Sequence, residues 1–406
     1  MKSDYWFFLA LVLLAVSLIM HQAPLALLSL LFLLSGAVSR IWNKYCLHRV
    51  TFKRRLSSTR VFFGDEITYE YEITNMKPLP LPWLQVLDEL PEQVTLLKGK
   101  TEPASEHRVY LNSMFPVNMY HRVIRRYPVK CPVRGCFSFG PAVLRSGDPF
   151  GLFRRSMEVP DVDTLMVYPR LVSLEELGIP SKQFFGDIRL RQHIFQDPVL
   201  TAGVRDYYPG DSLKRIHWKS TARLGKLQTK IFEPTTTVDL SLFLDVRTLK
   251  PPYWGSIHQL QELGIITAAA VARHALEAGF RVGLYVNQIT RFSQGLVRVP
   301  HSQHPEQLER ILEALAQIHQ VENIEISKYV RQEAPHLPFG SSIVVITAQP
   351  ADEMRATLLT MKRMGRSVAI IQVGGEAPES GGYVPVYHVT DEKAWEVVEK
   401  IGLKQA

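Results

Sequence analysis

The segment Val238-Asp-Leu-Ser-Leu-Phe-Leu-Asp245 is a short, mostly apolar run that ends on an aspartate. Such a run is typical of a strand buried on both faces of a parallel sheet. Further strands are predicted over residues 281–287, 342–347, 367–373 and 384–389. Helices are predicted over residues 257–278, 305–320, 352–364 and 391–401. This alternation predicts an α/β domain of Rossmann type over residues 238–406, with a mostly parallel sheet covered on both faces.

The stretch from Arg205 to Glu233 reads as a turn, a short helix, a stop and a strand. Pro209-Gly210 suits a turn, because proline fixes φ at the first central position and glycine accepts positive φ at the second. Asp211 stands at a natural helix N-cap, and Gly225 stands where the helix would end. A strand follows over residues 227–232. The side chains predicted to face a core are Leu213, Ile216 and Trp218.

The same stretch is strongly basic. Its charged residues are Arg205, Lys214, Arg215, Lys219, Arg223, Lys226 and Lys230 against Asp206, Asp211 and Glu233. The simpler interpretation is a solvated helix face with one or two arginine–carboxylate pairs that hold a loop in place. The alternative is a docking surface for an acidic partner or a phosphate.

A catalytic role for this stretch would require Asp206, Asp211 and His217 to converge in one cleft. A capping aspartate and a packed histidine explain these residues more simply. No nucleophile elbow, zinc-protease motif or phosphate-binding loop is present in the sequence. We therefore predict that the chain is not an enzyme, and keep a hydrolase that uses these three residues as an alternative.

The pattern Tyr208-Pro-Gly-Asp-x-x-x-x-Ile-His-Trp-Lys-x-x-Ala-Arg-x-Gly-x-Leu227 closely resembles the signature of the bacterial family known as domain of unknown function number fifty-eight. Three other segments resemble that family in the expected order: Arg134-Gly-Cys-Phe-Ser-Phe-Gly140, Asp148-Pro-Phe-Gly-Leu-Phe153 and Val167-Tyr-Pro-Arg170. The resemblance implies a membrane hairpin, a β-rich module and a von Willebrand factor A-like (vWA-like) domain. It also implies a MoxR-type AAA+ ATPase as partner, with a transglutaminase-like membrane protein often encoded nearby.

We take the signature as the candidate partner-binding segment. Its residues are Arg205, Tyr208, Pro209, Gly210, Asp211, Lys214, Arg215, His217, Trp218, Lys219, Ala222, Arg223 and Gly225. Asp211, Arg215, Trp218 and Arg223 are predicted to hold the segment together. Arg205, Lys214 and Lys219 are predicted to be more exposed.

The vWA fold commonly carries a metal site, Asp-x-Ser-x-Ser, at the end of its first strand, where ligands of open α/β sheets bind. Here Asp245 is followed by Arg247 and Leu249 at the serine positions. Hard cations such as Mg²⁺ need several oxygen ligands, and only Thr248 and Thr347 remain as hydroxyl candidates. A guanidinium beside the aspartate repels a cation and can replace it in a salt bridge. We therefore predict no bound metal and no cofactor, and keep as the disfavoured alternative a degenerate site in which Asp245 still binds Mg²⁺.

Residues 1–45 are predicted to form two transmembrane helices. Apolar runs over residues 5–20 and 25–38 are separated by His21-Gln-Ala-Pro24, which suits a tight hairpin. Basic residues then follow with no acid before Asp65: Arg40, Lys44, Arg49, Lys53, Arg54, Arg55 and Arg60. This asymmetry predicts a multi-pass protein of the bacterial inner membrane, with both termini and the large soluble part cytoplasmic. A cleaved signal peptide is the alternative, disfavoured because the apolar sequence resumes directly after the break.

Residues 46–170 are predicted to form an antiparallel β-sandwich-like module. Ile67, Tyr69, Tyr71 and Ile73 alternate with polar residues, which is the pattern of a half-buried strand. Cys131 and Cys136 are predicted as reduced thiols on a surface hairpin, which favours a reducing compartment. Residues 171–237 form a connector that carries the signature and belongs with the C-terminal unit, with a short helix expected over 174–177.

Composition narrows the function further. A net charge of +8, with 46% hydrophobic and 21% charged residues, is typical of a folded chain with a membrane segment. No nucleic-acid-binding module is visible, so nucleic acid is not predicted as a partner. The function we predict is a membrane-anchored adaptor, in which the hairpin binds the lipid bilayer and the vWA-like domain binds proteins in a chaperone-like or assembly role. The second alternative is an exported, adhesion-type ligand-binding protein.

Overall fold

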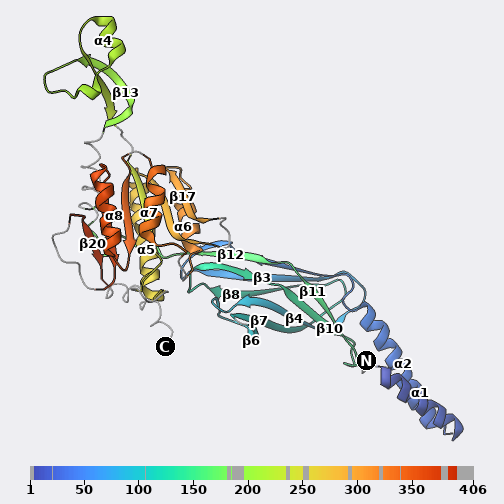
Figure 1. The fold of residues 1–406 in the computed structure, drawn as a ribbon. Coiled ribbons are helices and arrows are strands. Elements are labelled where there is room, and N and C mark those ends of the chain that lie inside the picture. Colours follow the sequence, from blue (N-terminus) through green and yellow to red (C-terminus); the bar gives the residue numbers. More distant parts are fainter. Residues whose placement is uncertain are drawn as a thin grey trace. The chain divides into compact units, whose positions relative to one another are not determined.

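The computed structural model describes residues 4–20, 22–105, 107–180, 184, 196–234, 238–249, 256–290, 295–319, 323–338, 340–375 and 383–390. The chain divides into two compact units, Met1–Val167 and Tyr168–Ala406. The first unit contains two apolar helices and a β-rich module, and the second contains the signature segment and an α/β domain (Figure 1).

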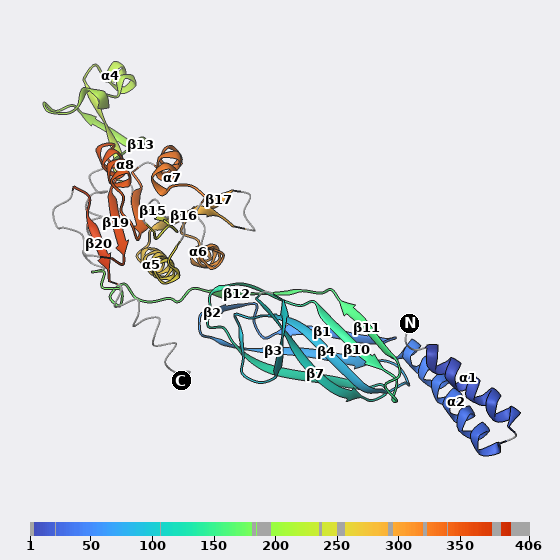
Figure 2. The ribbon, with the colours of Figure 1, turned by 60° about the horizontal axis from the view of Figure 1, so that its bottom comes forward.

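Two apolar helices begin the first unit: α1 spans Asp4–Ile19 and α2 spans Ala23–Tyr45, and they lie side by side (Figure 2). Within the described residues, α2 is the helix that is long and apolar enough to cross a membrane. Its 23 residues extend over about 34 Å, more than the hydrocarbon core of about 30 Å. Its apolar side chains are mostly exposed, as expected for lipid contact, although a signal sequence passes the same test of length and composition.

Within the described residues the β-rich module has twelve strands, and β1–β3, β3–β8, β5–β8, β4–β7, β6–β7, β4–β10, β10–β11 and β9–β12 pair in antiparallel fashion. Its sheets have the strand orders β1-β3-β8-β5, β11-β10-β4-β7-β6 and β2-β12-β9. The strands are β1 Val50–Leu56, β2 Arg60–Phe62, β3 Glu66–Asn75, β4 Leu81–Pro91, β5 Thr95–Leu96, β6 Lys100–Ser105, β7 Arg108–Val117, β8 Arg122–Lys130, β9 Gly135–Phe139, β10 Ala142–Gly147, β11 Arg154–Val159 and β12 Asp163–Tyr168.

One apolar core fills the module, with residues from all three sheets. The predicted alternation in β3 is confirmed, because Ile67, Tyr69, Tyr71 and Ile73 are each no more than 4% exposed. Cys46 and Leu47, which directly follow α2, belong to the same core. The end of α2 is therefore packed into the module rather than joined to it by a free linker.

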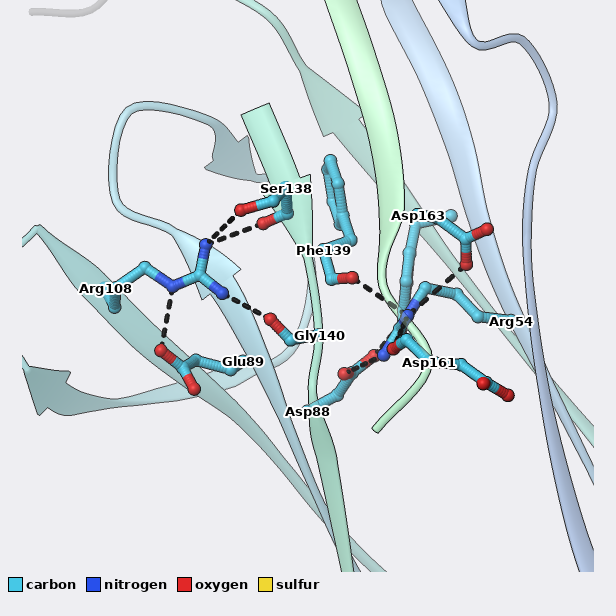
Figure 3. Close-up of polar contacts among 10 residues, drawn as sticks. Arg54, Asp88, Glu89, Arg108, Ser138, Phe139, Gly140, Asp161 and Asp163 are labelled. Atoms are coloured by element: carbon cyan, nitrogen blue, oxygen red, sulfur yellow. Dashed lines mark hydrogen bonds and ion pairs between the residues drawn. The ribbon is translucent and has the colours of Figure 1, made fainter. Parts of the chain in front are cut away.

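A buried ion pair joins two strands of this module (Figure 3). The guanidinium of Arg54 on β1 lies 2.5 Å from the carboxylate of Asp88 on β4, and also donates to the carbonyl oxygens of Phe139 and Asp161. The hydroxyl of Tyr69 donates to the same carboxylate. Burial raises the pKa of Asp88, and the hydrogen bond from Arg54 acts against that rise. Arg54, which contributed to the positive-inside pattern, is thus buried and paired inside the protein.

The prediction for the cysteines is wrong for Cys131, which is fully buried in the core of the module. Burial raises the pKa of its thiol to about 11. Cys136 on β9 is only partly buried, and Cys46, Cys131 and Cys136 are all free thiols. Four residues lie between the two positions, but Cys131 is buried in the core, so the two thiols do not form the surface pair that we expected.

The α/β domain of the second unit has one sheet of order β17-β16-β15-β18-β19-β20. All neighbouring strands are parallel except β17, which pairs antiparallel with β16. The strands are β15 Asp239–Leu244, β16 Arg281–Ile289, β17 Leu296–Ser302, β18 Ser342–Thr347, β19 Val368–Val373 and β20 Val386–Val389. The later α/β region is confirmed, and β15, β18 and β19 are buried along their whole length as their apolar runs predict.

Helices cover both faces of this sheet, α5 and α6 on one and α7 and α8 on the other (Figure 2). They span α5 His258–Glu277, α6 Gln307–Ala316, α7 Ile326–Glu333 and α8 Asp352–Arg363. The sequence prediction missed β17 and α7. The helix predicted over 391–401 lies outside the described residues, and the one predicted over 174–177 is a hydrogen-bonded turn.

Within the second unit and ahead of the α/β domain in sequence, β13 Gln196–Asp206 and β14 Gln228–Pro234 pair as an antiparallel ribbon. The segment that joins them contains a 3₁₀ turn, η1 Leu213–Arg215, and the helix α4 Trp218–Leu224. We call residues 203–231 the signature lobe, since they contain the family signature.

Candidate docking surface on the signature lobe

The turn at Tyr208–Asp211 is held by the aspartate that ends it. The N–H of Asp211 donates to the carbonyl of Tyr208 over 3.0 Å, and Gly210 has a φ of +114°, which glycine accepts without strain. The Asp211 carboxylate accepts from the Tyr208 N–H, the Arg205 guanidinium and the Thr229 hydroxyl, at 3.1, 2.7 and 3.2 Å. The Arg205 hydrogen bond holds the pKa of this carboxyl below its usual value. Asp211 therefore joins its own turn to β13 and β14.

The prediction that Asp211 caps a helix is wrong. Ser212 has an extended backbone and precedes η1, so the carboxylate turns back toward its own turn instead of facing a helix end. The N-cap of α4 is His217, whose Nδ1 accepts from the N–H of Ser220 over 3.1 Å. A ring nitrogen that accepts carries no proton, which assigns the neutral tautomer with hydrogen on Nε2. The predicted stop at Gly225 is confirmed, with a φ of +65° and its N–H bonded to the Thr221 carbonyl.

The apolar side chains of the lobe are largely in solvent. Ile216 is buried as predicted, but Leu213 and Trp218 are 67% and 68% exposed, against the prediction that they face a core. Tyr208 and Leu224 are 66% and 60% exposed. A seven-residue helix on a two-stranded ribbon has no opposing layer against which it can bury these groups. All four are therefore exposed apolar side chains of one small lobe.

Basic side chains are exposed on the same lobe. Lys214, Lys219, Arg223 and Lys226 are exposed, and none of the described carboxylates pairs with them. The acids of the lobe are already engaged, since Asp211 holds Arg205 and Asp206 accepts from Gln228 Nε2 over 2.5 Å. We define the docking surface as Tyr208, Leu213, Lys214, Trp218, Lys219, Arg223, Leu224 and Lys226.

Of the residues predicted to hold the lobe together, Asp211 does so, but its partner Arg205 was predicted to be more exposed. The structural pair is Arg205 with Asp211, and Arg205 also lies over the ring of Tyr208, 5.5 Å from its centroid. Trp218 and Arg223, predicted to be structural, are exposed. The side chain of Thr221 and the backbone of His217 join α4 to β14 through Gln228. Polar residues of β14, which the sequence prediction did not single out, therefore do much of the positioning.

The three residues of the hydrolase alternative occur on this one lobe but share no hydrogen bond among the described contacts. Asp206 bonds Gln228, Asp211 bonds Arg205, and His217 Nδ1 caps α4. A general base needs its imidazole within hydrogen-bond reach of the group that it activates or of a carboxylate that orients it. The observed partners give each of the three a structural task.

Asp245 lies at the carboxyl end of β15, buried to 5% exposure. Its carboxylate accepts from Asn287 Nδ2 at 2.8 Å, from the Thr347 hydroxyl at 2.9 Å and from the backbone N–H of Arg247 at 3.1 Å. Burial raises the pKa of this carboxyl, and these hydrogen bonds act against the rise. Three donors from the protein thus occupy the positions around the carboxylate that a cation would need.

The residues around Asp245 do not fit a metal ion. Thr248 uses its hydroxyl to accept from the N–H of Ile257 at the start of α5, away from the carboxylate. Asn287, at the end of β16, presents its amide N–H₂ to Asp245, and a donor cannot serve as a ligand. Among the residues that the structure describes, no three His, Cys, Asp or Glu side chains gather closely enough to hold a metal.

Comparison with known proteins gives a family for part of the chain. A family model described as "Protein of unknown function DUF58" matches residues 203–367, from the signature lobe to the start of β19. The uncharacterized protein YeaD of Bacillus subtilis (strain 168) is 26% identical over 320 residues, which cover 76% of this chain and 73% of YeaD.

Solved structures give only weak similarity. A non-cellulosomal cohesin from Archaeoglobus fulgidus has a TM-score of 0.21 at 11% identity, and covers 32% of this chain and 96% of that protein. A cohesin module from Clostridium perfringens has a TM-score of 0.21 at 8% identity, and covers 29% of this chain and 96% of the module.

Proposed function

The chain belongs, through residues 203–367, to the family described as Protein of unknown function DUF58, and from this premise we propose that it is a membrane-anchored adaptor that binds an acidic protein partner. The observation that carries the proposal is the docking surface of the signature lobe. Tyr208, Leu213, Trp218 and Leu224 are all at least 60% exposed on a lobe of fewer than thirty residues. Exposed apolar groups gathered in this way mark interaction sites in soluble domains.

The residue types of this surface suit protein recognition. Tryptophan, tyrosine and arginine are the side chains that most often dominate the binding energy of an interface. The surrounding cations favour a partner with complementary negative charge, because charge complementarity steers association and excludes other partners. The Arg205–Asp211 pair and the turn at Gly210 keep the surface in one conformation, which lowers the entropy cost of binding.

The partner class that we propose is a MoxR-type AAA+ ATPase, on the resemblance of the signature to its family. A transglutaminase-like membrane protein would be a further component of the same assembly. In this proposal the adaptor connects the ATPase to the membrane, in a chaperone-like or assembly role. No step of catalysis is assigned to the chain.

The α/β domain is proposed to have the vWA-like fold. Supporting this, its strand order counted from β15 is 3-2-1-4-5-6, and Asp245 lies at the carboxyl end of the first strand beside Thr347 of the fourth. In this proposal the domain supports the docking surface without a metal.

Anchoring is proposed to occur through α1 and α2 together, as a hairpin that leaves both termini and the soluble part in the cytoplasm. The apolar surface of α2 and the basic residues that follow it support this orientation. Protease added to intact spheroplasts should leave the α/β domain uncut. Digestion from outside would instead favour the exported, adhesion-type alternative.

Affinity purification from crosslinked native membranes tests the partner. The wild type should enrich an AAA+ ATPase, and both Trp218→Ala and the double variant K214E/K219E should lose it. The matched control is R355E/R363E on α8, which makes the same change in charge at two exposed positions of the same unit. If the two lobe variants retain the ATPase as well as the control does, or if the wild type enriches none under any nucleotide condition, the adaptor proposal is wrong.

A further inference from the structure

A pocket of about 500 Å³ opens on the β-rich module, within the first unit. Strand register places its floor on one face of the five-stranded sheet. Met114 on β7, Gln85 on β4, Arg145 on β10 and Ser156 on β11 pair in turn across the four strands. Because side chains alternate between faces, Arg154, two residues before Ser156, lies on the same face as Arg145.

The pocket is strongly cationic. Arg145, Arg154 and Arg155 line it, and its lining contains no carboxylate. All three side chains are exposed, and none of the described acids pairs with Arg145 or Arg154. Two guanidinium groups that converge without a carboxylate between them form a site for an anion with several oxygens, since guanidinium donors match carboxylate and phosphate in geometry.

An aromatic wall and two apolar side chains border the cations. The ring of Trp83 lies beside Gly147, where an added Cβ would come to 2.9 Å from the ring and to 2.1 Å from the Phe153 carbonyl oxygen, so this position requires glycine. The loop between β10 and β11 is held by the buried Asp148 carboxylate, which accepts from the N–H groups of Phe150, Leu152 and Phe153. This arrangement leaves Phe150 62% and Leu152 38% exposed. The family-like segment Asp148–Phe153 thus lines the pocket through Gly151 and exposes an apolar side chain on each side of it.

The position of the pocket relative to α2 indicates the source of the anion. Arg155 donates to the carbonyl of Lys44, in the last turn of α2, over 2.6 Å. Helix α2 contacts β10 and β11, and both views place these strands next to it (Figures 1 and 2). Trp42 packs against the core of the module, and Tyr45 is half exposed at the helix end. Aromatic residues at a helix end mark the level of the lipid headgroups.

We propose that this pocket binds the phosphate headgroup of an anionic phospholipid, with Phe150 and Leu152 against the acyl-chain boundary. The proposal rests on the anchoring of α2 proposed above. The lipid would orient the β-rich module on the membrane surface, since Arg155 connects the pocket to the helix that crosses the bilayer. Exposed aromatic and aliphatic groups beside basic residues are the composition that binds anionic membrane surfaces.

Native mass spectrometry of the full chain in detergent micelles tests the proposal. Phosphatidylglycerol and phosphatidylcholine with the same acyl chains are added, and we expect one phosphatidylglycerol to be retained preferentially by the wild type. The double variant R145Q/R154Q should bind it roughly 30-fold more weakly, since each basic residue near an anionic surface contributes about fivefold. The conservative variant R145K/R154K should keep most of the affinity, because the charges remain.

The matched control is K98Q/K100Q. Lys100 lies on β6, the edge of the same sheet opposite β11, and both lysines are exposed. This control removes the same charge and should bind phosphatidylglycerol like the wild type. Equal loss in the control, or unchanged binding by R145Q/R154Q, would contradict the pocket. Displacement of the lipid by millimolar glycerol 1-phosphate or inorganic phosphate would also overturn the proposal, because the ligand would then be a soluble phosphate.

Failure of the anchoring is recognised separately. Carbonate extraction of cell membranes should leave the full chain in the membrane pellet. If the chain is released into the soluble fraction, the anchoring proposal is wrong whatever the pocket binds. If the chain stays in the pellet and phosphatidylglycerol binding does not depend on Arg145 and Arg154, the lipid pocket alone is wrong.

Discussion

Replacement of Asp245 tests our proposal that its carboxylate at the end of β15 has a structural role and does not bind a metal. In Asp245→Ala, three buried donors lose their acceptor: the N–H of Arg247, the amide of Asn287 and the hydroxyl of Thr347. A buried unsatisfied donor costs about 1–3 kcal/mol. The threonine hydroxyl can rotate toward another acceptor. We therefore expect the free energy of opening of β15 and β18 to fall by about 3–5 kcal/mol.

Asp245→Asn is the matched variant, because it keeps the shape and one acceptor oxygen while it removes the charge. We expect it to change the opening free energy by only about 1 kcal/mol, since the burial cost of the charge disappears together with part of the hydrogen bonding. Hydrogen–deuterium exchange of the full chain, read on peptides from β15 and β18, measures the difference. The alanine variant should exchange there at least a hundredfold faster than the wild type.

The pH dependence of the same experiment has a defined sign. Burial raises the pKa of Asp245 in the folded chain, so the folded state binds the proton more tightly than the unfolded state. The contribution of Asp245 to stability is therefore largest below the unfolded pKa of about 4 and falls as the pH rises toward the folded value. If Asp245→Asn has a larger opening free energy than the wild type at pH 7, this difference should become smaller as the pH is lowered.

Two results would refute this reasoning. If Asp245→Ala exchanges like the wild type, the three hydrogen bonds do not hold the strand ends together. If millimolar Mg²⁺ slows exchange at β15 and β18 in the wild type but not in Asp245→Asn, the carboxylate binds the cation and the site is not closed, because a ligand stabilises only the state that binds it.

Three further predictions concern the other polar contacts. Asp211→Ala should speed exchange in the turn at 207–211, with β15 unchanged, because the carboxylate holds the turn and not a helix; unchanged exchange in the turn would contradict this. Arg54→Met should destabilise the β-rich module by about 3–5 kcal/mol, read by urea-dependent proteolysis, because it leaves Asp88 buried and unpaired, and adding Asp88→Leu should restore part of the loss. Cys131 should resist maleimide at pH 8 and react only in urea, since its pKa of about 11 keeps the thiol protonated; prompt labelling of the native chain would refute its burial.

Most strands and helices of the α/β domain could be predicted from the sequence, because their burial requires apolar residues in a recognisable pattern. Val238–Asp245 and Ser342–Thr347 are apolar runs that only a strand covered on both faces accommodates, and both were located within two residues. The edge strand β17 was missed, since an antiparallel edge alternates polar and apolar residues over only seven positions. Helix α7, with eight residues, is too short for its period to stand out.

The signature lobe was predicted less well because its side chains have no core to enter. Periodicity assigns Leu213 and Trp218 to a buried face, but the rule holds only where a second layer covers that face. The role of Asp211 was misjudged for a related reason. A carboxylate beside a turn can accept from the turn or from a helix, and Arg205, six residues earlier, decides the choice through a contact that the sequence does not reveal.

The polar groups at the end of the α/β sheet are buried and hydrogen-bonded, whereas the basic and aromatic groups of the signature lobe are exposed. This difference bears on which region binds a partner. Ligands of open sheets normally bind where the strand order reverses, which in this domain lies between β15 and β18. Asp245 and Thr347 meet at that point and are hydrogen-bonded to each other. On the lobe, by contrast, Asp206 and Asp211 are hydrogen-bonded to residues of the lobe itself, while the basic side chains of the docking surface and the ring of Trp218 are exposed to solvent. Binding energy comes from groups that exchange water for a partner, so we infer that it resides in the lobe and that the sheet supplies rigidity.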